Sequence, residues 1–293
     1  MISAPANSGT SAAQSRRSTR EVLTQAIEKL ASCGIATPSD DARRLLTHAL
    51  NCSASTLPLI EVIDEHQSAA FDGLIAQRAR RLPVSYITGF RDFFKHRFVV
   101  SADVLDPRPE SETLVDAALA ATPCEQSGYV LDLGVGSGCL LLSVLAERPL
   151  LTGVGTDISA AALDIARQNA QNLGLDDRTD YIQCDWTSGV HGYFNLILCN
   201  PPYISKEDAK RLAPEISWEP IIALTPGGDG LAAYRALARE CRAVLTSDGV
   251  AFFEFGCGQG RDVATIFEEA GWKTTLRPDL DGRDRVLEAR LAM

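Results

Sequence analysis

The sequence lacks the long apolar stretches, paired cysteines and basic excess that are typical of membrane, metal-binding and nucleic-acid-binding proteins. No apolar run approaches the about 20 residues that a membrane-spanning helix needs, so no membrane attachment is expected. The eight cysteines include no C-x-x-C pair and have no histidine at zinc-ligand spacing. We therefore expect reduced thiols, no metal site and a cytoplasmic location. The formal net charge of −10 argues against a surface built to bind phosphate backbones, and no direct DNA binding is expected.

What remains is the composition of a globular protein with an ordinary core. Hydrophobic residues make up 45% of the 293 positions and charged residues 23%, which is enough apolar material to bury a sizeable interior. This length accommodates one large α/β domain of roughly 170 residues together with a smaller domain. We expect the protein to be a monomer.

Residues 1–19 are rich in serine, alanine and threonine and contain no acidic residue. Such a segment cannot bury a core, so a disordered tail is predicted. An organelle transit peptide has the same composition, but this segment lacks clear apolar periodicity. It also lacks the apolar central stretch of a secretory signal.

Residues 20–83 are predicted to form a small helical bundle. Apolar residues recur at helical spacing from Glu21 to the pair Cys33-Gly34, and again through residues 42–50. Further helical segments are expected at 60–63 and 71–82. A bundle of this size is marginally stable alone, so it must either dock on the rest of the chain or serve a partner.

Residues 84–112 are predicted to form a β-hairpin connector, because the segments 84–87 and 97–100 are typical of short strands. Basic residues gather within and just before it. The members of this basic cluster are Arg78, Arg80, Arg81, Arg91, Lys95 and Arg97. Two interpretations stay open, a solvated face and a docking surface for an acidic or RNA-containing partner.

Residues 113–293 alternate predicted strands and helices, which indicates an α/β domain with a Rossmann-like parallel sheet. Strands are expected at 129–133, 154–156, 181–184, 194–199, 250–255, 272–276 and 285–291. The last two are expected to pair as an antiparallel hairpin around the turn Asp281-Gly282. The expected helices include 139–147, one capped by Ser159 and Gly174, one at 231–245 and one at 263–270.

A glycine-rich turn follows the first of these strands. It consists of Gly134, Val135, Gly136, Ser137 and Gly138, and it allows the backbone to approach a ligand at the start of the next helix. Asp157 ends the second strand about twenty residues later, where it can accept hydrogen bonds from both ribose hydroxyls of an adenosine cofactor. The alternative for Asp157 is a carboxylate that only stabilises a helix N-terminus.

Two residues after the third strand extend this predicted cofactor site. Asp185 can accept the exocyclic amine of an adenine, and Trp186 offers a flat apolar face or a backbone amide. Packing of Trp186 in the core is the alternative. The position of the pair favours the cofactor, because ligands of open α/β sheets bind at the carboxyl ends of the strands.

The tetrapeptide Asn200, Pro201, Pro202 and Tyr203 follows the fourth strand and resembles that of S-adenosylmethionine-dependent methyltransferases acting on a planar nitrogen. An amide nitrogen is a poor nucleophile because its lone pair is delocalised. The Asn200 side-chain oxygen and the Pro201 carbonyl can each accept one N–H and align the lone pair with the methyl group. The prolines fix the backbone, and Tyr203 can lie against the amide. An ordinary Pro-Pro turn with a packed tyrosine is the alternative.

More specific motifs resemble the HemK/PrmC family of protein-(glutamine-N5) methyltransferases over about residues 45–291. The stretches that carry this resemblance are 83–89 (Pro-Val-Ser-Tyr-Ile-Thr-Gly), 107–112 (Pro-Arg-Pro-Glu-Ser-Glu), 218–220 (Trp-Glu-Pro), 223–224, 228–231, 254–256, 259–260 and 281–286. The sequence departs from the family at Ser111, Asn195 and Lys95, where threonine, aspartate and often glycine are usual. Ser111 keeps the hydroxyl.

The resemblance implies a seven-stranded methyltransferase domain and a helical domain that binds class I peptide chain release factors. The acceptor would be the glutamine of their Gly-Gly-Gln loop. The cofactor would be S-adenosylmethionine, with S-adenosylhomocysteine as product, held by residues 134–138, Asp157, Trp186 and Asn200. For Arg108 and Glu112 the resemblance leaves two roles open. They could shape the channel for the substrate glutamine, or they could have a structural role in a salt bridge.

Three other functions remain open. A related enzyme that methylates a ribosomal-protein glutamine would use the same tetrapeptide. A nucleic-acid amino methyltransferase would use the same chemistry, but it needs base flipping and a basic, aromatic recognition region. The third is a non-catalytic protein that keeps the fold as a scaffold, which an intact Asn200 and Asp157 argue against.

Overall fold

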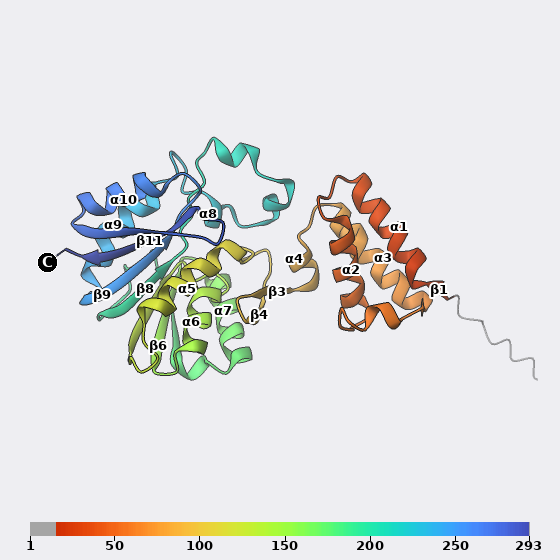
Figure 1. Ribbon diagram of the computed structural model, residues 1–293, viewed down its shortest axis with the longest axis horizontal. Helices are drawn as coiled ribbons and strands as arrows, with labels where there is room; N and C mark the ends of the chain where they lie inside the picture. The colour runs from red at the N-terminus through yellow and green to blue at the C-terminus, as the bar shows by residue number, and fades with distance from the viewer. Residues whose placement is uncertain (1–15, 293) are drawn as a thin grey trace, which may run out of the picture. The chain divides into compact units, whose positions relative to one another are not determined.

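The computed structural model describes residues 16–292, and the chain divides into two compact units between Thr88 and Gly89 (Figure 1). Most of the predicted disordered tail, residues 1–15, lies outside the described residues. The last residues of that predicted tail are ordered, because Arg17–Ser18 form strand β1 and Thr19 begins the first helix. No helix in the described part of the chain is long and apolar enough to cross a membrane.

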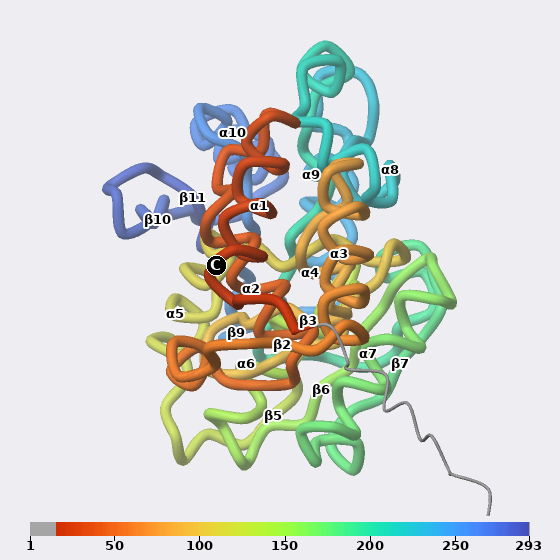
Figure 2. Tube along the Cα trace, turned by 90° about the vertical axis from the view of Figure 1, so that its right-hand side faces the viewer, coloured from red at the N-terminus to blue at the C-terminus, as the bar shows by residue number. Residues whose placement is uncertain are grey.

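The N-terminal unit is built from helices that pack around one apolar core, as the sequence predicts. Its elements are α1 (Thr19–Ser32), α2 (Pro38–Ala49), α3 (Glu65–Ala79), α4 (Val84–Thr88), the 3-10 helix Leu57–Leu59, and the strands β1 and β2 (Val62–Ile63). Helices α1, α2 and α3 lie against one another (Figure 2). Leu30, Leu45 and Phe71, one from each of these helices, are fully buried between them.

Two short segments of this unit differ from the sequence prediction. Helix was expected at 60–63, but Val62 and Ile63 form β2, which pairs antiparallel with β1. Strand was expected at 84–87, but this segment is helix α4. Its first turn closes when the Pro83 carbonyl accepts hydrogen bonds from the N–H groups of Tyr86 and Ile87. Val84 and Ile87 are three residues apart, so a helix places both on one apolar face.

The predicted hairpin is present, but its first strand lies later in the sequence. Strands β3 (Phe90–Phe93) and β4 (His96–Val99) pair antiparallel and belong to the second unit. Phe94 begins the tight turn between them with a φ of 54°. The fully buried Phe93 and Phe98 anchor this hairpin in the core of the second unit.

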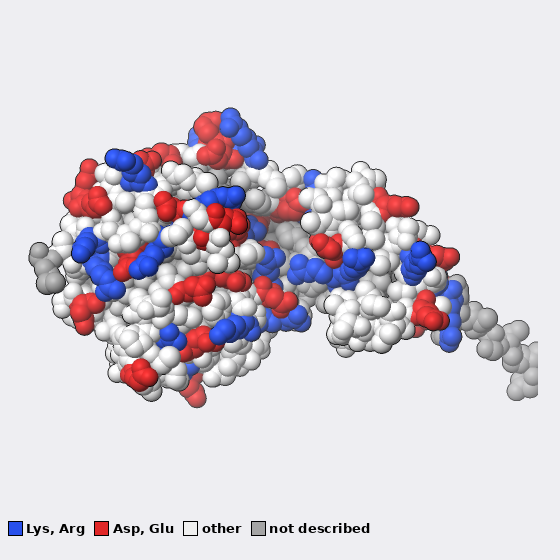
Figure 3. Space-filling model, in the orientation of Figure 1, with Lys and Arg blue, Asp and Glu red and all other residues white. Residues whose placement is uncertain are grey.

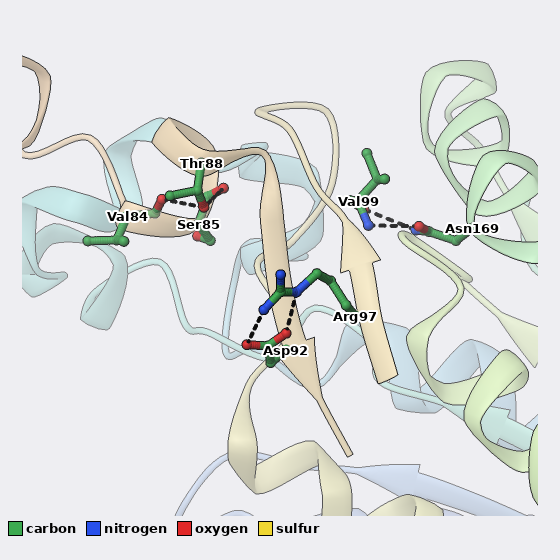
Figure 4. Close-up of polar contacts among 7 residues, drawn as sticks. All are labelled: Val84, Ser85, Thr88, Asp92, Arg97, Val99 and Asn169. Carbon is green, nitrogen blue, oxygen red and sulfur yellow. Dashed lines mark hydrogen bonds and ion pairs between the residues drawn. The ribbon is translucent and has the colours of Figure 1, made fainter. Parts of the chain in front are cut away.

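Most members of the basic cluster of residues 78–97 have a partner within their own unit. Arg78 is buried and bonds Asp41 at 2.7 Å, so it holds α3 against α2. Arg81 donates to a backbone carbonyl at 2.8 Å. In the hairpin, Arg97 forms a bidentate pair with Asp92 (Figure 4). On the face drawn in Figure 3, basic and acidic side chains alternate. These pairings favour the structural interpretation of the cluster over a docking surface.

The second unit contains a seven-stranded sheet in the order β10-β11-β9-β8-β5-β6-β7, which confirms the predicted fold class. Strands β7, β6, β5, β8 and β9 are parallel, and β11 and β10 close the sheet as an antiparallel pair. The strands are β5 (Gly128–Leu133), β6 (Leu151–Asp157), β7 (Thr179–Gln183), β8 (Phe194–Cys199), β9 (Leu245–Glu254), β10 (Trp272–Pro278) and β11 (Asp284–Leu291).

Helices cover both faces of this sheet (Figure 1). They are α5 (Glu112–Ala121), α6 (Cys139–Glu147), α7 (Ala160–Leu173), α8 (Ile221–Leu224), α9 (Ala232–Glu240) and α10 (Gly260–Glu269), with 3-10 helices at Pro109–Ser111, Asp176–Arg178, Asp208–Arg211, Pro214–Trp218 and Cys241–Ala243. Helices α5, α6 and α7 bury one apolar cluster, and α9 and α10 bury the other. Helices therefore cover both faces of the parallel strands, and the carboxyl ends of these strands are left for a binding site.

Candidate active site

One pocket lies at the carboxyl ends of four neighbouring strands, β8, β5, β6 and β7. Most of the predicted site residues line it, although they come from four separate stretches of sequence: Gly134, Val135, Gly136, Ser137, Asp157, Asp185, Trp186, Asn200 and Pro202. The other three predicted residues are not among those that line it. Gly138 is the N-cap of α6, Pro201 is buried, and Tyr203 packs against the apolar cluster beneath α9 and α10. The structure thus brings the two motifs to one site.

The glycine turn is tied to the end of the neighbouring strand β6. The N–H groups of Gly134 and Val135 both donate to the Thr156 carbonyl, at 2.9 and 2.8 Å. Gly136 has a φ of 53°, a left-handed conformation that glycine adopts at little cost. Its N–H donates to the carboxylate of Asp157 at 3.0 Å. The turn is therefore held in place by the same strand end that carries the predicted ribose acceptor.

Asp157 contacts the backbone at the start of α7 and also lines the pocket. One carboxylate oxygen accepts the Gly136 N–H, and the other accepts the Ser159 N–H at 2.9 Å at the start of α7. Ser159 itself caps that helix, as predicted, by accepting from the Ala162 N–H. A carboxylate has about four acceptor positions, so two remain available on the pocket side. Asp157 can thus organise the backbone and still accept hydroxyl groups.

Trp186 likewise fits both of the interpretations offered for it. The residue adopts a left-handed φ of 45°, lines the pocket, and packs its partly buried ring against the core beneath α9 and α10. A Cβ atom on Gly134 would lie 3.6 Å from the Trp186 ring, so the glycine turn and the indole are in close contact. The neighbouring Asp185 is exposed at the pocket rim.

The tetrapeptide is held from three directions. Asn200 donates through Nδ2 to the hydroxyl of Ser111 at 3.2 Å, while no group among residues 16–292 donates to its Oδ1. The Tyr203 hydroxyl bonds the carboxylate of Glu254 at 3.5 Å, and the Tyr203 carbonyl accepts from Gln259 at 3.0 Å. Asn200 therefore keeps a free acceptor at the pocket wall.

The family-like segment 228–231 supports this arrangement sterically. Gly230 has a φ of 82°, and a Cβ atom there would collide with the Tyr203 carbonyl oxygen. The glycine is thus required both by its backbone conformation and by the close approach of the tetrapeptide.

Arg108 and Glu219 form an ion pair between two loops of the pocket wall. The pair measures 2.5 Å, and the Glu219 side chain is only 1% exposed. Burial lowers the pKa of Arg108, but the charge and hydrogen bond of Glu219 outweigh it and raise that pKa overall. Burial also raises the pKa of Glu219, against the opposing effect of Arg108. Glu112, by contrast, accepts the Phe94 N–H at 2.8 Å and supports the hairpin turn.

Two buried carboxyl groups lie beneath the site. Asp132, near the end of β5, accepts the Leu141 N–H at 3.2 Å, and burial raises its pKa to about 7. Glu254 ends β9, and burial raises its pKa to about 7 while hydrogen bonding with Ser111 and the charge of Arg285 oppose the rise. Sequence reasoning assigned no role to either group.

A further residue that the sequence analysis missed is Asn169 of α7 (Figure 4). Its side chain accepts the Val99 N–H at 2.7 Å and donates to the carbonyls of Val99 and Ser137, at 3.0 and 2.9 Å. It therefore joins the hairpin to the glycine turn. The available signal was an amide next to Ala166 and Ala170 on the apolar face of a predicted helix.

Asn169→Ala is expected to lower the free energy of unfolding by about 2–3 kcal/mol, because one buried and two partly buried backbone groups lose their partner. Chemical denaturation measures this change. Asn172→Ala, on an exposed position of the same helix, is the matched control and is expected to stay within about 0.5 kcal/mol of the wild type. Equal stabilities of the two variants would contradict the anchoring role of Asn169.

The sheet order, the glycine turn after β5 and the polar tetrapeptide after β8 define the second unit as a methyltransferase of the Rossmann-like class. Its fold is similar to that of the catalytic domain of hMettl16, with a TM-score of 0.54 and 13% identity over 67% of this chain and 76% of that one. Residues 21–89 match the family model described as PrmC N-terminal domain, and residues 91–236 match the one described as methyltransferase small domain.

Full-length relatives narrow this class. The chain is 46% identical to a release factor glutamine methyltransferase from Cereibacter sphaeroides over 92% of this chain and 98% of that protein. It is 44% identical to the protein of the same name from Caulobacter vibrioides, over 90% and 93% of the two chains. The chain belongs to the release factor glutamine methyltransferase family, which confirms the resemblance found in the sequence.

Proposed function

We propose that the protein transfers a methyl group from S-adenosylmethionine to the side-chain amide nitrogen of a glutamine in class I peptide chain release factors. The observation that carries this proposal is the free Oδ1 of Asn200, which lies in the same pocket as the glycine turn and Asp157. A free hydrogen-bond acceptor beside a site for an adenosine cofactor fits an enzyme that transfers a methyl group to a planar nitrogen. It fits a protein that only binds ligands less well. The name and length of the relatives favour a release-factor glutamine as the acceptor.

The residues of the cradle fit an adenosine cofactor. Gly134 and Gly136 carry no side chain and adopt left-handed conformations, so the backbone of the turn can approach a ligand closely, and Asp157 keeps two acceptor positions for ribose hydroxyls. Asp185 at the rim can accept the adenine amine, and Trp186 can contact the ring. When bound, S-adenosylmethionine supplies an electrophilic methyl group on a sulfonium.

The chain's own residues prepare the glutamine. Asn200 Oδ1 and the Pro201 carbonyl each accept one amide N–H, which turns the nitrogen lone pair toward the methyl group. Pro201 and Pro202 restrict the backbone, so both hydrogen-bond acceptors are fixed before the substrate glutamine binds. The Arg108–Glu219 pair stiffens the opposite wall. The methylated nitrogen is acidic enough to lose its proton to water.

The N-terminal unit would then serve recognition of the release factor. Its core is complete without the second unit, because all the buried residues of that core lie within the N-terminal unit. The domain model that matches it covers residues 21–89, so it begins one residue after the start of the predicted binding domain, 20–83, and ends inside the predicted connector, 84–112. We assign methyl transfer to the domain of residues 113–293.

Mass spectrometry of a purified release factor tests this function. After incubation with the protein and S-adenosylmethionine, we expect one added methyl group on the glutamine of the Gly-Gly-Gln loop and none on a Gln→Ala release factor. Methylation of a ribosomal-protein glutamine or of a nucleic acid, with no transfer to the release factor, would contradict the assignment. Binding of S-adenosylmethionine without transfer to any of these would indicate the scaffold alternative.

A further inference from the structure

The two central residues of the tetrapeptide cannot hold its backbone in place by hydrogen bonds of their own. Pro201 and Pro202 have no backbone N–H, so neither can donate a bond that would fix the Pro201 carbonyl. Each proline ring locks one φ angle and favours an extended conformation for the residue before it, so the segment is stiff. The direction of the Pro201 carbonyl therefore depends on how the two ends of the tetrapeptide are held.

The sheet fixes the first end. Cys199, the last residue of β8, lies opposite Leu133 of β5 on one side and Phe253 of β9 on the other. Asn200 follows directly in the sequence. Two neighbouring parallel strands thus set the position where the tetrapeptide begins.

The side chain of Gln259, just before α10, holds the second end. Its Nε2 donates to the Tyr203 carbonyl at 3.0 Å, and its Oε1 accepts the Gly256 N–H at 2.9 Å. A backbone carbonyl only accepts and a backbone N–H only donates, so both bonds can form in only one orientation of the Gln259 amide. Gly256 is itself tied to the sheet, because the N–H of the preceding Phe255 donates to the Arg285 carbonyl of β11 at 3.0 Å.

Two glycines make room for this bridge between Tyr203 and Gly256. A Cβ atom on Gly256 would lie 2.8 Å from Gln259 Oε1 and 3.0 Å from Cδ2 of Tyr203. A Cβ atom on Gly230 would lie 3.2 Å from Gln259 Nε2, in addition to its collision with the Tyr203 carbonyl. Backbone from two separate segments therefore packs directly against the bridge.

We infer that Gln259 is a positioning residue for methyl transfer, which fixes the Tyr203 end of the tetrapeptide and so holds the Pro201 carbonyl where it can accept an N–H of the substrate glutamine. This inference rests on the proposed function, in which that carbonyl is one of the two hydrogen-bond acceptors for the glutamine amide. Gln259 is not among the residues that line the pocket, so its effect passes through the tetrapeptide.

Gln259→Glu tests this role with almost no change of shape. The new carboxylate still accepts the Gly256 N–H, but it has no N–H for the Tyr203 carbonyl, so two acceptors would face each other. We expect kcat to fall about 10- to 100-fold, because a misplacement of about 1 Å at a reacting centre has an effect of this size. The Kd for S-adenosylmethionine is expected to stay unchanged. Gln168→Glu, at an exposed position of α7, makes the same change of charge and is expected to keep kcat within about twofold.

Gln259→Met separates positioning from packing, because methionine has a similar length but makes neither hydrogen bond. If Gln259 only fills space beside Tyr203 and at the start of α10, both Gln259 variants lose stability at most and keep kcat. That result would overturn the inference. Positioning instead predicts that both variants are slow while chemical denaturation shows them folded under the assay conditions.

NMR spectra of the labelled protein, recorded without acceptor, follow the two bonds separately. The Tyr203 carbonyl-carbon signal is expected to shift in both Gln259 variants, because both lose the donor. The Gly256 amide is expected to keep slow hydrogen exchange in Gln259→Glu and to lose it in Gln259→Met. A Tyr203 signal that neither variant changes would overturn the inference.

The kinetic results also distinguish failure of this inference from failure of the proposed function. A wild type that methylates the release factor, with full kcat in Gln259→Glu, would overturn the inference alone. A protein that methylates a different acceptor, with the expected loss of kcat in Gln259→Glu, would refute the release-factor assignment alone.

Discussion

Asn200→Ala is expected to lower kcat for methyl transfer to the release factor by about 10²- to 10³-fold, the usual effect of removing one preorganised hydrogen-bonding group at a reacting centre. Asn200 Oδ1 is free at the pocket wall, and its Nδ2 is held by Ser111, so alanine removes an acceptor that is already in place. The acceptor amide would then keep only the Pro201 carbonyl. Its lone pair would be poorly aligned with the methyl group.

Single-turnover kinetics with quantitative mass spectrometry measure this effect. Folding is expected to change little, because Asn200 is only partly buried and makes one side-chain hydrogen bond. The exposed Asn172→Ala variant controls for loss of an asparagine as such. A normal kcat in Asn200→Ala, at saturating S-adenosylmethionine and acceptor, would refute the alignment of the amide by this residue.

Elements with strong local signals were predicted well from the sequence. Helix α6 begins directly after the glycine turn and ends near Pro149, and β8 is an apolar run that ends at a proline pair; both have the expected bounds. Helix α7 has a serine cap and ends at Gly174 with a left-handed φ of 66°. In each case the interactions that determine where the element begins and ends join residues a few positions apart, so they can be predicted from the sequence.

Short elements whose conformation depends on distant partners were predicted wrongly. The segment 60–63 is too short for periodicity to distinguish helix from strand, and it becomes a strand because its β-branched Val62 and Ile63 pair with residues 17 and 18. The expected helix at 231–245 stops at Glu240, and the strand that follows begins at Leu245, where it pairs with Phe194 of β8. Tertiary pairing overrides weak local preference in both segments.

The candidate site also has features that could be predicted from local sequence signals and features that could not. Residues next to the strand ends were found from the motifs alone, since parallel strands bring their carboxyl ends to one edge. The contacts that hold those residues in place were not found from the motifs, because they join segments that are far apart in the sequence. Ser111 and Asn200 are 89 positions apart, and Arg108 and Glu219 are 111 positions apart. The basic cluster shows the converse, since residues that are close in the sequence have separate partners, such as Asp41 for Arg78 and Glu147 for Lys95.

Asp157→Ala is expected to weaken S-adenosylmethionine binding about 100-fold, or ~3 kcal/mol, from the loss of hydrogen bonds to a charged group. Two effects contribute. The ribose hydroxyls would lose their acceptor, and the Gly136 N–H would lose the carboxylate that fixes the glycine turn. Because Ser159 also loses its bond to Asp157, the free energy of unfolding should fall by about 1–3 kcal/mol.

Isothermal titration calorimetry with S-adenosylhomocysteine measures the affinity, and Asp157→Asn separates the two contributions. Asparagine keeps one side-chain oxygen for a backbone N–H but carries no charge, so it should restore more stability than affinity. Asp164→Ala is the control, because Asp164 is an exposed residue of α7 whose only ion pair, with Arg167, lies at the surface of the described chain. An unchanged affinity in Asp157→Ala would remove Asp157 from the ribose and leave it the purely structural role of tying the glycine turn to the start of α7.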